Sequence, residues 1–260
     1  MLQEFDIAII GGGPAGSVTG LCLARLGWRV AILEASAFEG ERPGETLPPE
    51  INPVLRELGL VESFHECAPI ESPGVVSSWA SGKAQETDFT FNPFGFGWHI
   101  DRRRFDMMLF HAAKQAGASV FMGKRAEIAS AGIGWEVRRR GEPILVARFV
   151  VDAAGRNGCR MDGSRERHTE DALIATVLRV SFVDMQAHDQ RTFIEAAPDG
   201  WWYSACVPVN GLIAMFFTDR ESFRRGDAFI AEQMEHAPSV RHRMRGEIAQ
   251  ITTSIVAVSS

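Results

Sequence analysis

The sequence predicts an α/β fold in which a strand–helix–strand unit opens the chain and strand-rich segments follow it. Three observations support this fold class. Ile7, Ile9 and Ile10 form a β-branched run typical of a buried parallel strand. A glycine-rich turn, a helical pattern and a second strand over 29–33 come directly after it. From residue 173 to residue 217 the pattern is one of strands without helices between them.

The turn after the first strand reads Gly11-x-Gly13-x-x-Gly16, with Pro14 and Ala15 between the second and third of these glycines. In such a turn the first glycine allows a tight bend, and the second lets the backbone approach a pyrophosphate. The third lets the helix pack close to the strand. Free N–H groups and the dipole at a helix N-terminus favour negative charge. The turn therefore predicts a dinucleotide site.

The residues that follow complete this motif. The helix is predicted to end at Gly27, where a left-handed residue is needed, and to carry on one side Val18, Leu21, Cys22 and Leu26. Glu34 closes the second strand 18 residues after Gly16. It is placed to accept hydrogen bonds from a ribose, for which the expected spacing is about 20 residues. No Gly-Lys-Ser/Thr follows, which excludes a nucleotide-hydrolase phosphate loop; the alternative is a glycine-rich turn of another α/β protein.

Composition excludes several classes of protein. The chain has 33 acidic and 27 basic residues and a net charge of −6, so nucleic acid is not an expected partner. Residues 7–24 carry no charge, but their five glycines and one proline argue against a membrane span, and no basic region precedes them as in a signal peptide. The four cysteines are scattered, which predicts reduced, buried thiols, a cytoplasmic location and no metal site.

The remaining elements follow from periodicity and turn residues. Helices are predicted over 51–58, ended by Gly59, and over 105–116, with Asp101 as N-cap and Gly117 as its end. Thr218 with Glu221 resembles a capping box that opens a helix over 223–234. Strands are predicted within 75–91 and over 119–122, 135–139, 144–152, 173–182, 192–195, 201–209 and 212–217, with a hairpin turn at Asn210-Gly211.

Two further motifs give the chain a family resemblance. They are Trp98-His99-Ile100-Asp101-Arg102-x-x-Phe105-Asp106 and Val151-Asp152-Ala153-Ala154-Gly155-Arg156. With the opening motif, they resemble the single-component FAD-dependent monooxygenases of the para-hydroxybenzoate hydroxylase fold, a superfamily shared with flavin-dependent halogenases and geranylgeranyl reductases. The segments 42–49 and 198–204 are most similar to one branch, the maturase flavoproteins that act on peptidyl tryptophan in quinone-cofactor amino acid oxidases.

The resemblance implies a Rossmann-like FAD-binding domain interleaved with a β-rich substrate domain. The FAD domain is expected over 1–72 and 98–165, and the substrate domain over 73–97 and 166–260. The residues expected to bind FAD are Gly11, Gly13, Pro14, Ala15, Gly16, Glu34, Arg42, Arg102, Asp152 and Gly155. Two of these residues have a simpler alternative interpretation. Arg42 is then an exposed charge on a loop, and Asp152 is an acid in a turn at the end of a strand.

The activity that the resemblance implies is hydroxylation of an aromatic substrate with oxygen, and in the branch named above the substrate is a tryptophan side chain in a partner protein. The resemblance also implies NAD(P)H as a diffusible reductant of the flavin. The lack of a second glycine-rich βαβ unit suits enzymes of this type, which have no dedicated nicotinamide domain. Catalytic residues stay unassigned: His99 reads more readily as a structural hydrogen-bonding residue than as a catalyst. The aromatic residues Trp79, Trp98, Trp201, Trp202 and Tyr203 line either a substrate pocket or a sheet core.

Two departures from the family pattern keep alternatives open. Halogenases of this fold carry a lysine near the strand that here reads Val75-Val76-Ser77-Ser78-Trp79, and a Trp-x-Trp-x-Ile-Pro motif; both are missing, and Lys83 follows a turn glycine. A third family fingerprint, Gly-Asp followed by a proline, is not reached before Ser260. We therefore expect a chain truncated before the final FAD-binding segment, one that retains little flavin and no hydroxylase activity when expressed alone. A halogenase and an inactive nucleotide-binding fragment are the alternatives.

Overall fold

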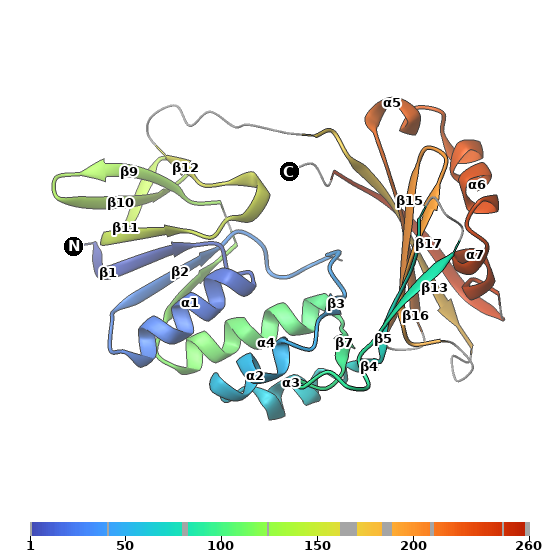
Figure 1. Cartoon of the computed structure of the whole chain (residues 1–260). Helices are drawn as coiled ribbons and strands as arrows, with labels where there is room; N and C mark the ends of the chain where they lie inside the picture. Colours follow the sequence, from blue (N-terminus) through green and yellow to red (C-terminus); the bar gives the residue numbers. More distant parts are fainter. Residues whose placement is uncertain are drawn as a thin grey trace. The chain divides into compact units, whose positions relative to one another are not determined.

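The structure is a computed structural model that describes residues 2–40, 42–79, 83–123, 125–161, 171–183, 189–208, 211–245 and 247–257. The chain forms two compact units, each built from two separate stretches (Figure 1). The first unit comprises Met1–Pro43 and Arg102–Arg167, and the second comprises Gly44–Asp101 and His168–Ser260. Residues 44–72 and 98–101, expected in the FAD domain, cluster with the second unit. The assignment of cofactor and substrate roles to whole domains stays a prediction.

The first unit is built on a mixed sheet. Its strands are β1 (Gln3–Ile10), β2 (Val30–Glu34), β8 (Ser119–Met122), β9 (Glu127–Ala131), β10 (Gly134–Arg139), β11 (Glu142–Asp152) and β12 (Arg160–Met161), in the order β12-β9-β10-β11-β1-β2-β8. Strands β11, β1, β2 and β8 run parallel, with Ile7 between Val30 and Phe149. The strands expected over 135–139 and 144–152 form an antiparallel meander with β9, β9-β10-β11, although β9 was not predicted.

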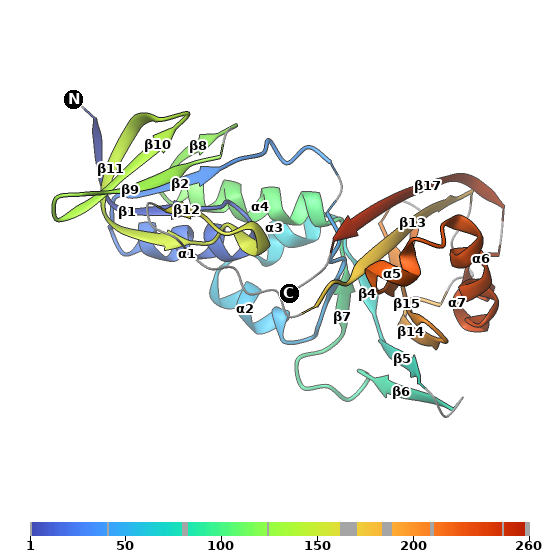
Figure 2. The ribbon, with the colours of Figure 1, turned by 90° about the horizontal axis from the view of Figure 1, so that it is seen from above.

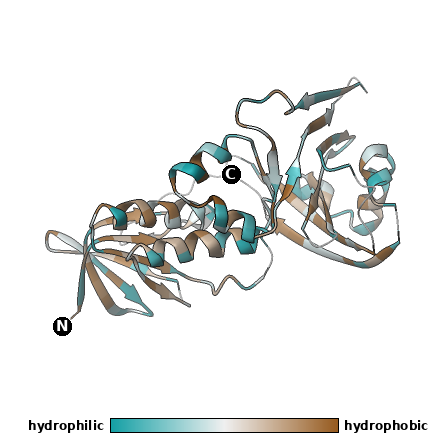
Figure 3. Cartoon of the chain, turned by 90° about the horizontal axis from the view of Figure 1, so that it is seen from below, coloured by the Kyte–Doolittle hydropathy of each residue, from teal (hydrophilic) through white to brown (hydrophobic). Residues whose placement is uncertain are grey.

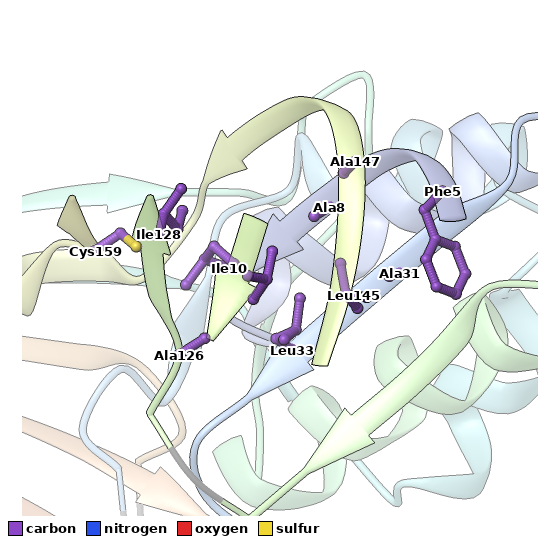
Figure 4. Close-up of a cluster of buried hydrophobic side chains, with 11 residues drawn as sticks. Phe5, Ala8, Ile10, Ala31, Leu33, Ala126, Ile128, Leu145, Ala147 and Cys159 are labelled. Atoms are coloured by element: carbon purple, nitrogen blue, oxygen red, sulfur yellow. The ribbon is translucent and has the colours of Figure 1, made fainter. Parts of the chain in front are cut away.

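The two faces of β1 and β2 are covered differently. Helices α1 (Pro14–Arg25) and α4 (Arg102–Gln115) contact each other beside the sheet, and Gly20 of α1 lies against Ile9 and Ile32. The opposite face packs against the meander through a buried cluster that includes Phe5, Ala8, Ile10, Ala31, Leu33, Ala126, Ile128, Leu145, Ala147 and Cys159 (Figure 4). Figure 3 shows the hydrophobic residues concentrated in these strands and alternating with hydrophilic ones along the helices.

The second unit contains a long, mainly antiparallel sheet in the order β17-β13-β16-β15-β14-β5-β6. Its strands are β5 (Gly74–Ser78), β6 (Ala84–Asp88), β13 (Ile174–Phe182), β14 (Thr192–Ala197), β15 (Gly200–Val207), β16 (Gly211–Thr218) and β17 (Ile248–Ala257). Helices α5 (Arg220–Phe223), α6 (Asp227–Glu235) and α7 (Pro238–Arg243) lie along one face (Figure 1). There Phe229 and Val240 pack in one cluster with Trp202 and Phe216. Strand β17 forms the edge beyond β13 (Figure 2).

A small sheet completes the second unit. It has the order β3-β7-β4, formed by β3 (Thr46–Leu47), β7 (Gly97–His99) and β4 (Ile70–Ser72), and two short helices, α2 (Ile51–Glu57) and α3 (Val61–Glu66), stand between β3 and β4 in the sequence. In the first unit a 3₁₀ turn, η1 (Gly155–Asn157), follows β11. Within the part of the chain that the structure describes, none of the helices has the length and apolar character needed to cross a bilayer.

The structure corrects several expectations from the sequence. In α1, Leu21 is buried, but Cys22 is exposed and Leu26 is 75% exposed, because the helix approaches the sheet through Gly16, Ser17 and Gly20 instead. Cys67, Cys159 and Cys206 are buried as expected.

The expected helix over 223–234 is also corrected, because it is divided at Gly226 (φ +79°). Asp219, rather than Thr218, caps the first part by accepting hydrogen bonds from the N–H groups of Glu221 and Ser222. Asn210, of the predicted hairpin turn, lies outside the described residues, whereas β15 and β16 pair antiparallel as expected.

Candidate functional site

The glycines of the opening motif differ in what requires them. A Cβ atom on Gly11 would lie 2.2 Å from the carbonyl oxygen of Ala153, and Gly11 has φ +109°. A Cβ atom on Gly16 would lie 1.9 Å from the carbonyl oxygen of Gly11. These two glycines are therefore required by the packing of the protein itself. A Cβ atom on Gly13 would meet no described atom within 4 Å, so the space beside Gly13 is open to a ligand.

The N-terminus of α1 opens from this turn. Gly13 is its N-cap with ordinary backbone angles (φ −70°), and Pro14, which has no N–H, is the first helical residue. The first turn carries no acidic side chain, and Gly13 itself supplies no side-chain cap. The positive end of the helix dipole is therefore not neutralised by a residue of this turn, as suits a pyrophosphate. The structure thus fits the diphosphate of a dinucleotide at Gly13, Pro14, Ala15 and Gly16.

Glu34 lies beside the same turn, at the end of β2. Its Oε2 accepts a hydrogen bond from the N–H of Gly12 (2.7 Å), and its Oε1 accepts from the N–H (2.9 Å) and hydroxyl (2.6 Å) of Ser36. Burial opposes the charge, but the hydrogen bonds from Ser36 and Gly12 outweigh it and hold the pKa of Glu34 below its usual range. Glu34 is thus a charged acceptor, and Oε2 has capacity for one more donor, such as a ribose hydroxyl.

Arg42 and Arg102 are brought together by a residue that the sequence did not single out. Asp106, on α4, is completely buried, and its carboxylate accepts from Nη1 of Arg42 (3.2 Å) and Nε of Arg102 (2.8 Å). Arg42 also donates to the hydroxyl of Ser36 (2.6 Å), and lies 3.5 Å from Glu34. Arg42 is therefore held in a network that reaches the glycine-rich turn, rather than being an isolated loop charge.

Asp152 and Gly155 lie next to this turn along β11. The N–H of Ala153 donates to the carbonyl oxygen of Ile10 (2.8 Å), which places the Asp152 motif beside Gly11. The Asp152 carboxylate accepts from the N–H groups of Ala154 (3.1 Å) and Cys159 (3.2 Å). These bonds agree with the alternative interpretation of Asp152 as an acid at the end of a strand that closes a turn. Contact of Asp152 or Gly155 with FAD stays a prediction.

A second buried polar network lies in the second unit and centres on His99. Its Nε2 is 2.7 Å from the carbonyl oxygen of Gln190, and its Nδ1 is 3.2 Å from the hydroxyl of Thr46. Thr46 in turn lies 2.5 Å from the hydroxyl of Tyr203. Burial lowers the pKa of His99 to about 4, although the Gln190 bond acts in the opposite direction. His99 is therefore a neutral hydrogen-bonding residue, as the sequence favoured.

The aromatic residues do not all gather in one pocket. Trp202 belongs to the core beneath α6 and donates to the carbonyl oxygen of Gln233 (3.2 Å). Trp98 packs edge-on against Phe64 and donates to Asn52 (2.7 Å). Trp98 and Trp202 are therefore packed in the protein interior and do not line a shared substrate pocket. Among the described residues no cluster of three or more histidine, cysteine or acidic side chains is arranged to bind a metal.

Comparison with known proteins agrees with this geometry. Residues 4–254 match the FAD binding domain family. The chain belongs to this family. The chain is 30% identical over 232 residues to LodB of Marinomonas mediterranea, which is named as a putative FAD-dependent oxidoreductase. This similarity covers 86% of this chain and 62% of LodB. The chain spans between about a third and three fifths of the length of the curated relatives it matches first.

Solved structures show the same fold. The flavin-dependent halogenase CmlS is 26% identical and superposes with a TM-score of 0.78, covering 100% of this FAD-binding chain and 50% of CmlS. QhpG, a peptidyl tryptophan dihydroxylase essential for tryptophylquinone cofactor biogenesis, is 21% identical with a TM-score of 0.72, covering 98% of this chain and 56% of QhpG. The superfamily and the α/β fold class inferred from the sequence are thus confirmed.

We expect Glu34→Ala to weaken FAD binding by about 1–3 kcal/mol, because a buried polar contact to the ribose is lost. FAD titration monitored by flavin fluorescence measures this change. Glu39→Ala is the matched control, since Glu39 is an exposed acid on the loop after β2. Equal FAD affinity of the Glu34 and Glu39 variants would remove Glu34 from the cofactor site.

Proposed function

We propose that this chain carries the FAD-holding part of a monooxygenase that uses NAD(P)H and oxygen to hydroxylate an aromatic substrate, a tryptophan side chain of a partner protein. FAD binding follows from the family, and the residues at the glycine-rich turn fit its diphosphate and ribose. When bound, FAD supplies the redox chemistry, taking electrons from the nicotinamide and passing them to oxygen. The task of the protein is then to hold the cofactor and to position the aromatic ring.

The candidate residues of the first unit would each have a different part in holding the cofactor. The N-terminus of α1 and Gly13 receive the diphosphate, and Glu34 receives the ribose. Arg42 and Arg102 add positive charge, and Asp106 fixes their orientation because it binds both guanidinium groups from a buried position. A fixed pair of guanidinium groups loses little side-chain entropy when it meets an anion.

The sequence of β5 is the observation that favours hydroxylation over halogenation. This strand runs Gly74–Ser78 and is followed by Trp79, with no lysine at the place where halogenases of this fold carry one. The tryptophan substrate is supported by the likeness to QhpG, which acts on peptidyl tryptophan. Halogenation is the second candidate, favoured by the 26% identity to CmlS.

Mass spectrometry of the product separates these functions. The chain is incubated with FAD, oxygen, a tryptophan-containing peptide and bromide, with either NADH, NADPH or a separate flavin reductase as the source of electrons. Hydroxylation adds an oxygen atom derived from labelled oxygen gas, whereas halogenation replaces a ring hydrogen with bromine. Gly13→Ala serves as the cofactor-deficient control. A brominated product would overturn our proposal. A chain that gives neither NAD(P)H-dependent oxygen consumption nor a modified peptide would favour the nucleotide-binding fragment.

A further inference from the structure

The outer strands of the two seven-stranded sheets differ in how they are protected from other strands. An outer strand leaves the N–H and C=O groups along one side unpaired, so proteins keep such strands short or place charges on them. In the first unit β12 has two residues and β8 has four, and in the second unit β6 carries Glu86 and Asp88. The remaining outer strand, β17, is ten residues long and has neither protection (Figure 2).

Strand β17 has the composition of a strand that pairs on both sides. Residues 248–258 contain no charged side chain, no glycine and no proline, and most of them are isoleucine, threonine, valine or alanine. The inner side of β17 pairs with β13, and among the described residues no strand pairs with its outer side. Alternate residues therefore direct their N–H and C=O groups away from β13. The outer side of β17 can thus receive another antiparallel strand.

One face of β17 also extends the core of the second unit toward solvent. Ile251 lies opposite Val180 on β13, and Ile255 lies opposite Thr176, so each pair shares a face of the sheet. Val180 and Thr176 are buried, whereas Ile251 and Ile255 are 51% and 61% exposed. The apolar face therefore continues past the covered core onto β17, where a further strand would partly bury the two isoleucines.

The order of residues along β17 identifies the strand that fits it. Every second residue from 249 to 257 reads Ala-Ile-Thr-Ile-Ala, which is the same in both directions. If two copies of the strand pair antiparallel with Thr253 opposite Thr253, then Ile251 of each copy lies opposite Ile255 of the other. On the other face Thr252 lies opposite Ser254, and no like charges meet anywhere along the strand. The strand is self-complementary, as a two-fold symmetric contact requires.

We propose that β17 is the contact surface of a two-fold symmetric dimer, in which the β17 strands of two copies of this chain pair antiparallel about Thr253. The large sheets of the two second units then form one continuous sheet, with the exposed isoleucines of each copy against those of the other. Association stops at two copies, because the pairing uses the outer edge of β17 in both. The contact lies within the second unit and does not depend on the proposed function.

A like charge at the symmetry axis tests this contact. We expect the wild-type chain to sediment as a dimer in the micromolar range. Thr253 is exposed, and Thr253→Lys should weaken the association about tenfold or more, because two ammonium groups then face each other. Thr87→Lys, the same change on the exposed strand β6 at the other end of the sheet, is the matched control and should leave the dimer intact. A monomeric wild-type chain would overturn the inference and leave β17 to a different strand, and a dimer that Thr253→Lys does not weaken would also overturn it.

A disulfide tests the register of the two strands. Directly opposite residues of antiparallel strands have Cα atoms about 4.5–5.5 Å apart, which a disulfide can span. In a chain whose exposed Cys22 is replaced by serine, Thr253→Cys should therefore form a covalent dimer on mild oxidation. Ile255→Cys should not, because its two copies would lie more than about 13 Å apart along the strands. Equal cross-linking of the two variants, or covalent species only from Ile255→Cys, would overturn the proposed pairing.

Discussion

Gly16→Ala is expected to destabilise the first unit by about 3 kcal/mol, enough to lower its population of folded molecules severely. The added Cβ atom would lie 1.9 Å from the carbonyl oxygen of Gly11, and the Gly11 backbone is held in place because its N–H donates to the carbonyl oxygen of Leu33 on β2. Relief of this clash requires α1 to move away from β1. Urea unfolding, followed by tryptophan fluorescence, measures the loss; a change below about 1 kcal/mol would show that α1 shifts without cost.

Gly13→Ala is the matched variant and should behave in the opposite way. Its Cβ atom meets no described atom within 4 Å, and Gly13 has ordinary backbone angles. We expect a stability loss of about 1 kcal/mol or less, as for a weaker helix N-cap. FAD affinity should nevertheless fall about tenfold or more, because the methyl group fills the space for the diphosphate. Unchanged FAD affinity would place the diphosphate elsewhere.

We expect acidification to lower the free energy of unfolding of the second unit, because His99 is buried in its neutral form. Its pKa is about 4 in the folded protein against 6.5 in the unfolded chain. Between these values the unfolded chain takes up a proton that folded His99 excludes, so stability is present above pH 6.5 and is lost as the pH falls toward 4. The shift corresponds to about 3 kcal/mol over this interval.

His99→Gln isolates this contribution from the titration of other groups. Glutamine keeps a donor for Gln190 and an acceptor for Thr46 but does not titrate. The wild-type free energy of unfolding should therefore fall relative to that of the variant by about 3 kcal/mol between about pH 7 and pH 4. Parallel pH profiles of the two proteins would mean that His99 is protonated in the folded state at little cost.

Apart from the close approach of Gly11 to Ala153, the opening motif could be predicted from the sequence because its constraints are local. Gly11 and Gly27 adopt the left-handed angles (φ +109° and +85°) that their places after a strand and after a helix require. Glu34 ends β2 beside the turn, as its spacing indicated. Each of these features depends on residues within one strand–helix–strand unit. The spacing of residues in the sequence is therefore enough to predict the backbone conformation there.

Long-range partners could not be predicted in the same way. Asp106 reads in the sequence as an acid on an amphipathic helix, and its bond to Arg42 joins residues 64 positions apart. In the sequence, Asp106 ends the motif that begins at Trp98, and its local partner is Arg102 four residues earlier, which fits an ordinary exposed helix pair. Likewise, β17 depends on its pairing with β13, where Ile255 lies opposite Thr176, and this pairing joins segments that are far apart in the sequence.

The burial of thiols in both units has a consequence for measuring their motions. Cys159 is enclosed in the first unit and Cys206 in the second, whereas Cys22 stands exposed on α1. A thiol reagent reaches an enclosed sulfur only when the structure around it opens, so its reaction rate reports the free energy of that opening. In a Cys22→Ser chain, peptide mass spectrometry would give separate modification rates for Cys159 and Cys206. These two rates would report how often each unit opens within one intact molecule.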